Sequence, residues 1–415
     1  MKIKREPTEI ELYIHIPFCI KKCNYCDFLS FSTTEKERNR YIDALCEEIR
    51  FTGSYVDPEH RIVRSIFLGG GTPSILESSQ TGRILQAIRD SFSVKEDAEI
   101  SMEANPGTLT EEKLRAYYNM GIHRLSIGLQ SVENSSLKRL GRIHTYEEFL
   151  ANYHLARRVG FQNINIDLMS ALPGQTLASY QAGLAEVLSL DPEHISSYSL
   201  ILEEGTPFYE DETIESELPD EDTERQMYEL TKTILSEYGY QRYEISNYAK
   251  AGKECLHNIG YWDDVPYLGM GLGAASYWKY EVLETDSIEN DTTAPHAEAG
   301  MKAGRVIRFS NTRSLEEYVR KPFLPFEERQ EYQILSIEEQ MEEYMFLGLR
   351  KMNGISIQSF QEKFHRDIKE VYGQVIAPFV DMNLLELVEG RLRLTEQGIS
   401  VSNRIFAEFL FDRDC

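Results

Sequence analysis

The sequence predicts an α/β protein with a parallel sheet in its first half and a small winged-helix-like α+β domain at its C-terminus. Three observations carry this prediction. Short apolar runs alternate with helical periodicity as far as Leu202, polar residues follow several of these runs, and three helical segments with a hairpin follow Ser336. Alternating strands and helices imply a parallel sheet with right-handed crossovers. Periodicity alone leaves an open doubly wound sheet and a barrel as alternatives.

The predicted elements of the first half follow in chain order. Six strands are expected at 12–16, 65–68, 98–104, 123–129, 163–169 and 194–202. Helices are expected between them at 36–50, 81–92, 110–120, 145–159 and 177–190. The fourth helix opens with a capping box, Thr145-x-x-Glu148. Another helix is expected at 221–238, after an acidic segment that suits the positive end of a helix dipole.

The C-terminal part has its own pattern. Helices are expected at 337–350, 357–364 and 368–382, then a hairpin at 385–394 and a final helix from Glu396. The segment lacks the dense basic face of DNA-binding winged helices, which indicates a structural or partner-binding domain. We therefore expect a sheet domain at 1–210, a connecting region at 211–335 with an acidic loop at 281–300, and a winged-helix-like domain at 336–415.

Composition and charge exclude several classes of protein. The 415 residues carry a formal net charge of −24, whereas sequence-independent nucleic-acid binding needs clustered lysine and arginine. No apolar run approaches the length of a membrane span. The first eleven residues are charged and contain no apolar signal region. We expect a cytoplasmic protein with no nucleic-acid partner and no transmembrane segment, either a monomer or a homodimer.

Three of the six cysteines lie together after the first strand, spaced C-x3-C-x2-C as Cys19, Cys23 and Cys26. Clustered thiolates are typical ligands of zinc or of an iron–sulfur cluster. A [4Fe–4S] cluster is normally held by four cysteines, so three leave one iron open to a chelating molecule such as S-adenosylmethionine. A Cys3His zinc site with His15 is the alternative. A disulfide framework is disfavoured because the chain is long and has few cysteines. The spacing favours the cluster.

Glycines and polar residues after the later strands predict a ligand site at the same edge of the sheet. The second strand runs into Gly69-Gly70-Gly71-Thr72-Pro73, where missing side chains let the backbone approach a ligand. The polar residues at or just past the other strand ends are Glu103, Gln130, Arg142 and Asp167. Parallel sheets bind ligands at this edge. A carboxylate there can hold an ammonium group, and an arginine can hold a carboxylate.

These motifs resemble the radical S-adenosylmethionine superfamily, in which an aromatic residue, here Tyr25, precedes the third cysteine. Nearly the whole chain is similar to the oxygen-independent coproporphyrinogen III oxidase family and, within it, to the haem-chaperone branch. The resemblance implies a partial (β/α)6 barrel, with a [4Fe–4S] cluster on the three cysteines. It also implies contacts to one or two molecules of S-adenosylmethionine from Tyr13, Tyr25, Gly70, Gly71, Thr72, Glu103, Gln130, Arg142 and Asp167.

A second motif, H-N-x-x-Y-W, begins at His257. A histidine beside aromatic residues suits a flat ligand whose iron needs an axial donor, although chemistry alone favours a core histidine. The motif is typical of the haem-chaperone branch, so the resemblance implies that His257, with Tyr261 and Trp262, binds haem. Members of the branch often carry a histidine where this chain has Ala275, so no haem role is expected there.

Two functions fit the sequence. The first is a haem chaperone, whose partners are haem, acceptor haemoproteins and a reductant protein for the cluster. The second is an oxygen-independent coproporphyrinogen III oxidase or another radical enzyme. The oxidases carry a fourth cysteine two positions after the third, where this chain has Phe28, and they have a longer segment before the first strand than the twelve residues that precede Tyr13. Both differences, and the motif at His257, favour the chaperone.

Overall fold

A twelve-stranded curved sheet organises the computed structural model, which describes residues 8–56, 61–280 and 305–411. Its strands are β1 (Thr8–Ile16), β2 (Arg61–Gly70), β3 (Ser93–Ala104), β4 (Arg124–Gln130), β5 (Ile164–Ser170), β6 (His194–Ser199), β7 (Gln241–Arg242), β8 (Asn247–Ala249), β9 (Tyr267–Met270), β10 (Ala275–Lys279), β11 (Val306–Ser310) and β12 (Gln330–Ile334). The predicted strands β1 to β6 are consecutive parallel neighbours, which confirms the expected α/β class.

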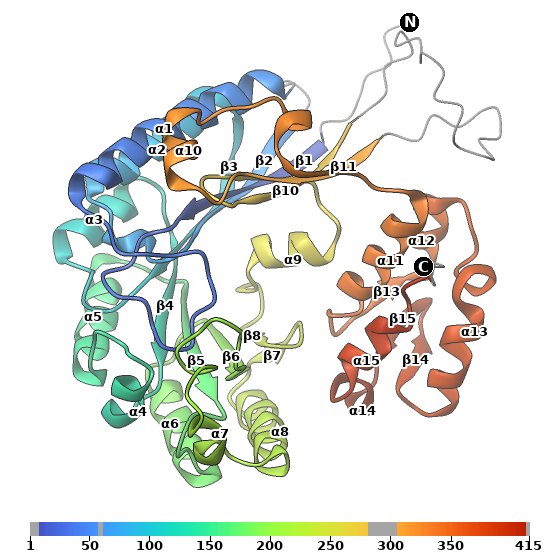
Figure 1. The fold of residues 1–415 in the computed structure, drawn as a ribbon. Helices are drawn as coiled ribbons and strands as arrows, with labels where there is room; N and C mark the ends of the chain where they lie inside the picture. The colour runs from blue at the N-terminus through green and yellow to red at the C-terminus, as the bar shows by residue number, and fades with distance from the viewer. Residues whose placement is uncertain (1–7, 57–60, 281–304, 412–415) are drawn as a thin grey trace, which may run out of the picture.

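Helices connect the strands of the first half and cover the outer face of the sheet. The helical elements as far as residue 237 are α1 (Glu35–Tyr55), the 3-10 turn η1 (Pro73–Ile75), α2 (Ser78–Ser91), α3 (Glu111–Asn119), α4 (Asn134–Arg139), α5 (Tyr146–Val159), α6 (Leu177–Ser189), α7 (Ile214–Glu217) and α8 (Glu221–Glu237). Figure 1 shows α1, α2, α3, α5 and α6 outside the curve, whereas α9 (Leu256–Trp262) lies inside it. The capping box is present, since Thr145 and Glu148 each accept a hydrogen bond from the other's backbone N–H.

Strand β4 shows why one side of the curve is polar. Its sequence RLSIGLQ alternates, and all seven residues are buried. Because successive strand residues point to opposite faces, Leu125, Ile127 and Leu129 pack into the apolar core. Arg124 and Ser126 face the interior of the curve, where they line a cavity. A buried strand of a parallel sheet is usually apolar on both faces, so this alternation marks an interior that holds polar groups.

The connecting region contributes more to the sheet than its sequence indicates. Strand β9 pairs in parallel with β1 on the side away from β2, and β10, β11 and β12 continue from it as antiparallel neighbours. Strands β8 and β7 extend the opposite edge beside β6. Helix α10 (Leu315–Arg320) and the 3-10 turn η2 (Phe326–Glu328) connect β11 to β12. The expected acidic loop at 281–300 lies outside the described residues.

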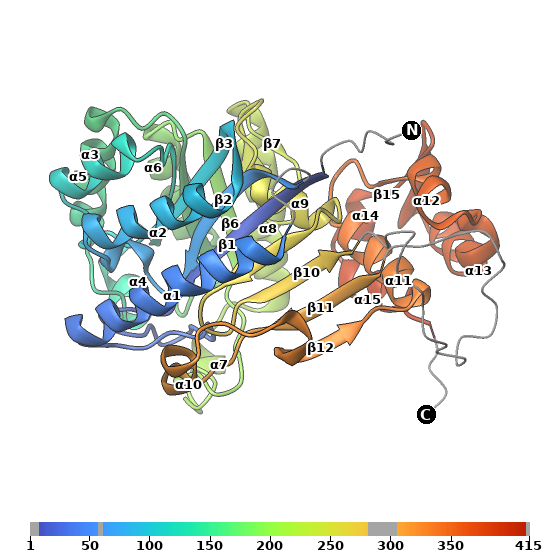
Figure 2. The ribbon, with the colours of Figure 1, turned by 90° about the horizontal axis from the view of Figure 1, so that it is seen from above.

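The C-terminal part forms a second apolar core around a small sheet in the order β13-β15-β14. Its elements are α11 (Ile337–Gly348), β13 (Ile355–Ser356), α12 (Ile357–Phe364), α13 (Ile368–Asp381), β14 (Leu385–Val388), β15 (Arg391–Leu394), α14 (Glu396–Ile399) and α15 (Ser402–Ala407). The predicted final helix is thus two short helices. Figure 2 shows this domain beside β11 and β12, which are antiparallel neighbours. Among the described residues, no helix has the length and apolar character needed to cross a membrane.

Candidate functional site

The three cysteines lie on the loop after β1 and line one cavity of about 510 Å³ at the carboxyl edge of the sheet. All three thiols are free and partly exposed. Backbone hydrogen bonds hold the loop, because Cys19 N–H donates to Phe31 at 3.1 Å and Asn24 N–H donates to Leu140 at 3.0 Å. The loop therefore presents three soft ligands to one space, although no three histidine, cysteine, aspartate or glutamate side chains in the described ranges are arranged to hold a metal ion.

The sulfur atoms already have polar neighbours from other strands. Cys19 Sγ lies 3.4 Å from Thr72 Oγ1, and Arg142 Nη1 donates to Cys23 Sγ at 3.6 Å. Burial raises the pKa of the Cys26 thiol, and the neighbouring Cys23 and Cys19 act in the same direction. Because metal binding requires thiolates, a bound cation would reverse this effect.

His15 does not fit the alternative zinc site. Its Nδ1 atom lies 3.0 Å from the Tyr13 hydroxyl, and its Nε2 atom lies 3.0 Å from the Leu29 carbonyl oxygen. Both ring nitrogens are therefore engaged, and the side chain is 8% exposed. His15 instead ties the strand to the far end of the cysteine loop. Tyr41 on α1 also holds this strand, because its hydroxyl donates a hydrogen bond to the His15 carbonyl oxygen at 2.7 Å.

The glycine segment after β2 passes directly beneath the cysteine loop. Gly71 N–H donates to the Ile16 carbonyl oxygen at 2.9 Å. A Cβ atom on Gly71 would lie 2.8 Å from the Phe18 carbonyl oxygen, and one on Gly70 would lie 2.5 Å from the His15 ring. Gly70 also has a φ of +112°, which favours glycine. Both glycines are needed so that this backbone can lie against the loop and face the cavity.

The carboxyl group of Glu103 faces the same cavity beside this segment. It accepts a hydrogen bond from Gly70 N–H at 2.9 Å. Burial and then the charge of Asp167 raise the pKa of Glu103 to about 8. Asp167 accepts from the Ser126 hydroxyl at 3.1 Å and from Asn165 Nδ2 at 2.7 Å. Within the described ranges no basic side chain forms an ion pair with either carboxyl group, so the two favour a positively charged ligand group, such as the amino group of S-adenosylmethionine.

Gln130 and Arg142 line the cavity, and each has a buried polar atom without a hydrogen-bond partner in the described structure. Gln130 Oε1 and Arg142 Nε are buried and have no hydrogen-bond partner within the described part of the chain. Gln130 also has a φ of +71°, an uncommon conformation for a residue with a side chain. Arg142 Nη2 donates to the Gly128 carbonyl oxygen at 2.7 Å, so its remaining donors can meet a carboxylate.

The structure thus brings most of the sequence-predicted ligand residues to one cavity. Its lining includes Tyr25, Gly70, Gly71, Thr72, Glu103, Gln130, Arg142 and Asp167. Tyr13 lies deeper, in an adjoining pocket of about 220 Å³ that shares Glu103, Ser126, Asp167 and Tyr198 with the cavity. These donors and acceptors suit a ligand that carries an amino group, a carboxylate and hydroxyl groups.

His257 lies on α9 and forms part of this deeper pocket. Its Nδ1 atom lies 2.8 Å from Ser65 Oγ, and its Nε2 atom lies 2.9 Å from the Tyr261 hydroxyl. The side chain is 1% exposed, and its ring stacks on Phe67. Burial, and then the charges of Arg64 and Arg124, lower the pKa of His257 to about 3. The imidazole is therefore neutral, and both of its nitrogens have partners inside the barrel.

The rest of the motif lies on two sides of α9. The Tyr261 ring packs against Tyr267 on the other side of the helix, where Tyr261 and Trp262 line a separate, mostly apolar pocket of about 250 Å³. The Trp262 ring lies 4.6 Å from the Arg350 guanidinium. Glu99 fixes the start of the helix by accepting hydrogen bonds from Leu256 and His257 N–H at 3.1 and 3.3 Å. The motif therefore joins the barrel interior to the C-terminal domain.

Several polar residues of the deeper pocket were not predicted as site residues from the sequence. They are Arg124, Ser126, Asn165, Ser196, Asn247 and Asn258. The sequence pattern that could have indicated them is the alternation of polar and apolar residues within strands of a parallel sheet, as in β4.

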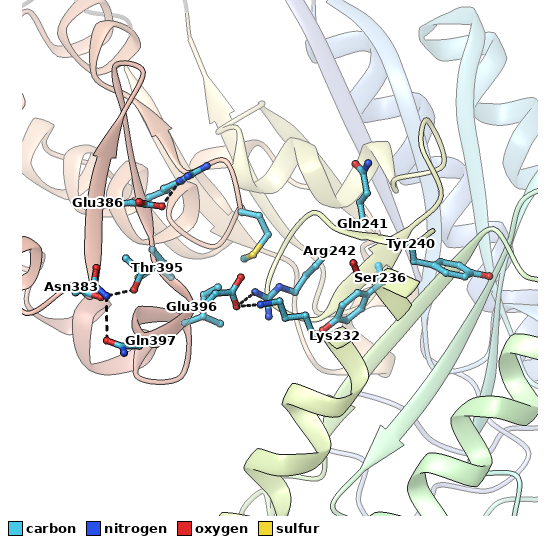
Figure 3. A pocket seen from close by; sticks show the side chains of 15 residues that line it. Lys232, Ser236, Tyr240, Gln241, Arg242, Asn383, Glu386, Thr395, Glu396 and Gln397 are labelled. Carbon is cyan, nitrogen blue, oxygen red and sulfur yellow. Dashed lines mark hydrogen bonds and ion pairs between the residues drawn. The ribbon is translucent and has the colours of Figure 1, made fainter. Parts of the chain in front are cut away.

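Another crevice, of about 680 Å³, lies between α8 and the C-terminal domain. Figure 3 shows Lys232 and Arg242 pointing across it to Glu396, at 2.8 and 2.7 Å. It shares no lining residue with the cysteine cavity and contains no cysteine. We interpret it as a polar boundary between two domains.

Comparisons with known proteins show the fold and the family of the chain. A family model described as the Radical SAM superfamily matches residues 13–182, and one described as the HemN C-terminal domain matches residues 335–401. The solved structure of coproporphyrinogen III oxidase (HemN) from Escherichia coli covers 97% of this chain and 90% of its own, with a TM-score of 0.79 and 23% identity, and it shows the fold. The fold and the three-cysteine loop define a radical SAM protein, a class that implies a [4Fe–4S] cluster and S-adenosylmethionine.

Two curated relatives identify the family. The protein named heme chaperone HemW from Lactococcus lactis subsp. lactis is 36% identical over 401 residues, which cover 96% of this chain and 97% of that protein. The one from Bacillus subtilis is 34% identical over 401 residues, covering 96% and 98%. The chain belongs to the HemW family.

Proposed function

We propose that this protein binds haem and transfers it to acceptor haemoproteins. The observation that carries the proposal is the similarity of nearly the whole chain to relatives that are named heme chaperone. The likeness to the oxidase is 23% identical and supports only the shared fold. The function requires an acceptor haemoprotein and a reductant for the cluster. We place the protein in the cytoplasm, where its thiols stay reduced.

In this proposal, Cys19, Cys23 and Cys26 hold a [4Fe–4S] cluster whose fourth iron binds S-adenosylmethionine. Glu103 receives the amino group, Arg142 the carboxylate and Asp167 the ribose hydroxyls, because these groups match the charges and hydrogen-bonding atoms of the cavity. Together, the bound groups can supply a one-electron cleavage that yields a carbon radical. The residues of the chain hold the ligand and limit its contact with water.

An oxygen-independent coproporphyrinogen III oxidase is the second candidate, and one observation favours it. The cavity contains ligand-binding groups beside all three cysteines, which is what a radical enzyme needs. Against it stands Phe28, which is 70% exposed and occupies the position of the fourth cysteine of the oxidases.

We propose His257 as the haem ligand, with Tyr261 and Trp262 as neighbours of the haem. Iron binding through Nε2 would have to replace the hydrogen bond to Tyr261, because that nitrogen is engaged. The pocket beside His257 has a volume of about 220 Å³, so α9 would have to move to admit a tetrapyrrole. The proposal therefore includes a displacement of α9 when haem binds.

The test is an anaerobic haem titration of the reconstituted protein, followed in the Soret band. Wild type, His257→Ala and the surface control His154→Ala would be compared. Saturable binding that only His257→Ala weakens, by tenfold or more, would support the proposal and the ligand. Equal binding by all three would keep haem and reject His257. Absence of binding would reject the chaperone, and anaerobic turnover of coproporphyrinogen would then test the oxidase.

A further inference from the structure

The deeper pocket contains a buried cation that the cysteine site does not use. Arg124 begins β4, is 3% exposed and lines the pocket of about 220 Å³ inside the barrel. No residue in the described ranges forms a hydrogen bond or ion pair with it, and its Nε atom is fully buried. Buried guanidinium groups are normally paired, because an unpaired charge is costly to remove from water. The pocket therefore has free donors that a ligand can satisfy.

The carboxylates around Arg124 are already engaged by other groups. Glu99 accepts from the first N–H groups of α9, Glu103 accepts from Gly70, and Asp167 accepts from Ser126 and Asn165. None of them lies within salt-bridge distance of Arg124. Burial opposes the charge of Arg124, but the nearby acidic groups, Cys255 and then Glu99, raise its pKa above the ordinary value. Arg124 thus remains a cation with unused donors.

The two ends of the deeper pocket carry different polar groups. Glu103 and Asp167 lie at the end shared with the cysteine cavity, whereas Arg124, Asn247 and Asn258 line only the deeper pocket. The Asn258 side chain lines the pocket and forms no hydrogen bond within the described ranges. The Asn247 Oδ1 atom is buried without a partner there. The carboxylate acceptors therefore lie at the end of the pocket that adjoins the cysteine cavity. The Arg124 guanidinium and the Asn258 amide lie at the opposite end, which we call the floor of the barrel. A ligand with a carboxylate at one end fits this order.

We propose that the floor of the barrel binds the carboxylate of a small ligand, with Arg124 as the main donor and Asn258 as the second. The pocket has room for about seven waters at roughly 30 Å³ each, so it accommodates a short acid but not a tetrapyrrole ring. The carboxylate belongs either to a free short-chain acid or, if the proposed function holds, to a propionate arm of haem. His257 and Tyr261 line the same pocket and bring the H-N-x-x-Y-W motif into contact with this ligand.

Calorimetric titrations of the full-length, anaerobically reconstituted protein with propionate and its uncharged analogue propionamide test the site. The proposal predicts saturable propionate binding that is at least about tenfold tighter than propionamide binding, as expected for charge-assisted hydrogen bonds. Arg124→Gln should remove this preference, whereas Arg115→Gln, on the exposed surface of α3, should keep it. Equal affinity for the two compounds in wild type, or no propionate binding, overturns the proposal without any variant.

Asn258→Asp provides a second variant, since it adds a negative charge to the pocket and leaves Arg124 in place. It should weaken propionate binding by at least about tenfold through like-charge repulsion. An unchanged affinity would overturn the role of Asn258 and the assignment of the ligand to this pocket. Arg124→Lys should retain part of the preference, because it keeps the charge but loses the fork of donors.

Haem and haem dimethyl ester distinguish the two sources of the carboxylate. If the ligand is a haem propionate, wild type should bind haem at least about tenfold tighter than the ester, Arg124→Gln should not, and free propionate should compete with haem. If it is a free acid, propionate should bind without this competition. Propionate binding without haem binding would reject the haem chaperone and keep this inference. Haem binding without any carboxylate preference would keep the haem chaperone and reject this inference.

Discussion

The Tyr261 hydroxyl lies 2.9 Å from Nε2 of His257, one turn earlier on α9, and so occupies the nitrogen that would ligate iron. Tyr261→Phe removes this competitor while keeping the ring that packs on Tyr267. A hydrogen bond of about 0.5–1.5 kcal/mol is lost, so we expect haem affinity to increase by about two- to tenfold. The Soret titration measures it. Tyr267→Phe is the control, and a fall in affinity for Tyr261→Phe would show that this hydroxyl contacts haem itself.

Cys26→Ser should abolish the cluster, because a three-cysteine set that loses one thiolate no longer holds three irons. Iron and acid-labile sulfide after anaerobic reconstitution should fall to a small fraction of the wild-type content. Cys46→Ser is the matched control, since Cys46 is buried on α1 outside the cavity. Full iron content in the Cys26 variant would contradict the assignment of the ligands.

Glu103 should make the ligand-free protein less stable as the pH rises from about 5 to 8, in a comparison of wild type with Glu103→Gln. The pKa of Glu103 is about 8 in the folded state against 4.5 ordinarily, so the folded state holds the extra proton in this window and unfolding becomes easier as the pH rises. The contribution of Glu103 to the free energy of unfolding should fall by less than about 1.4 kcal/mol per pH unit, because its carboxyl group faces a cavity. Urea titrations at several pH values measure this slope.

Glu103→Gln should flatten part of that slope. Glu11, whose pKa burial raises to about 8 despite its ion pair with Arg64, contributes in the same direction. The neutral His257, with a pKa of about 3, contributes in the opposite direction below about pH 6.5. Glu111→Gln, on the surface of α3, should leave the slope unchanged. An identical slope in wild type and Glu103→Gln would show that the Glu103 carboxyl group is ionised in the folded protein at neutral pH.

Glu396→Gln should loosen the boundary between the barrel and the C-terminal domain. It removes the carboxylate that Lys232 and Arg242 share and leaves Arg242, whose side chain is 6% exposed, without that partner. We expect a loss of about 0.5–1 kcal/mol, since the glutamate is itself largely exposed. Hydrogen exchange in β15 and α14 should become faster. Glu386→Gln, which breaks a pair with Arg393 inside the domain, should not change exchange in β7.

Gly71→Ala should destabilise the cysteine loop. Its Cβ atom would lie 2.8 and 2.9 Å from the backbone oxygen and nitrogen of Phe18, which cannot move without shifting the loop. We expect a loss of about 1–3 kcal/mol and a lower melting temperature. Gly373→Ala is the opposite case, because no atom lies within 4 Å and α13 gains about 0.5–1 kcal/mol from a better helix former. Equal melting temperatures would contradict the close approach at Gly71.

Much of the fold was predictable because it depends on local pattern. The strands β1 to β6 and the helices between them follow apolar runs and helical periodicity, and the capping box at Thr145 marks one helix start correctly. The cluster motif was predictable for the same reason, since three cysteines within eight residues lie on one loop whatever surrounds them. The glycines after β2 gave a comparable local signal.

The sequence by itself determined the α/β alternation, the cysteine loop and the polar residues at the carboxyl edge of the sheet. Only the tertiary structure decided that β9 pairs with β1, where Tyr13 lies opposite Gly269, and that α9 lies inside the barrel with both nitrogens of His257 engaged. It also decided that Arg124 is buried without a partner in the described structure. The physical reason is that the pairing of β9 with β1 and the contact of Ser65 with His257 join segments more than a hundred residues apart. No local periodicity records which distant surface a short strand or a polar side chain will meet.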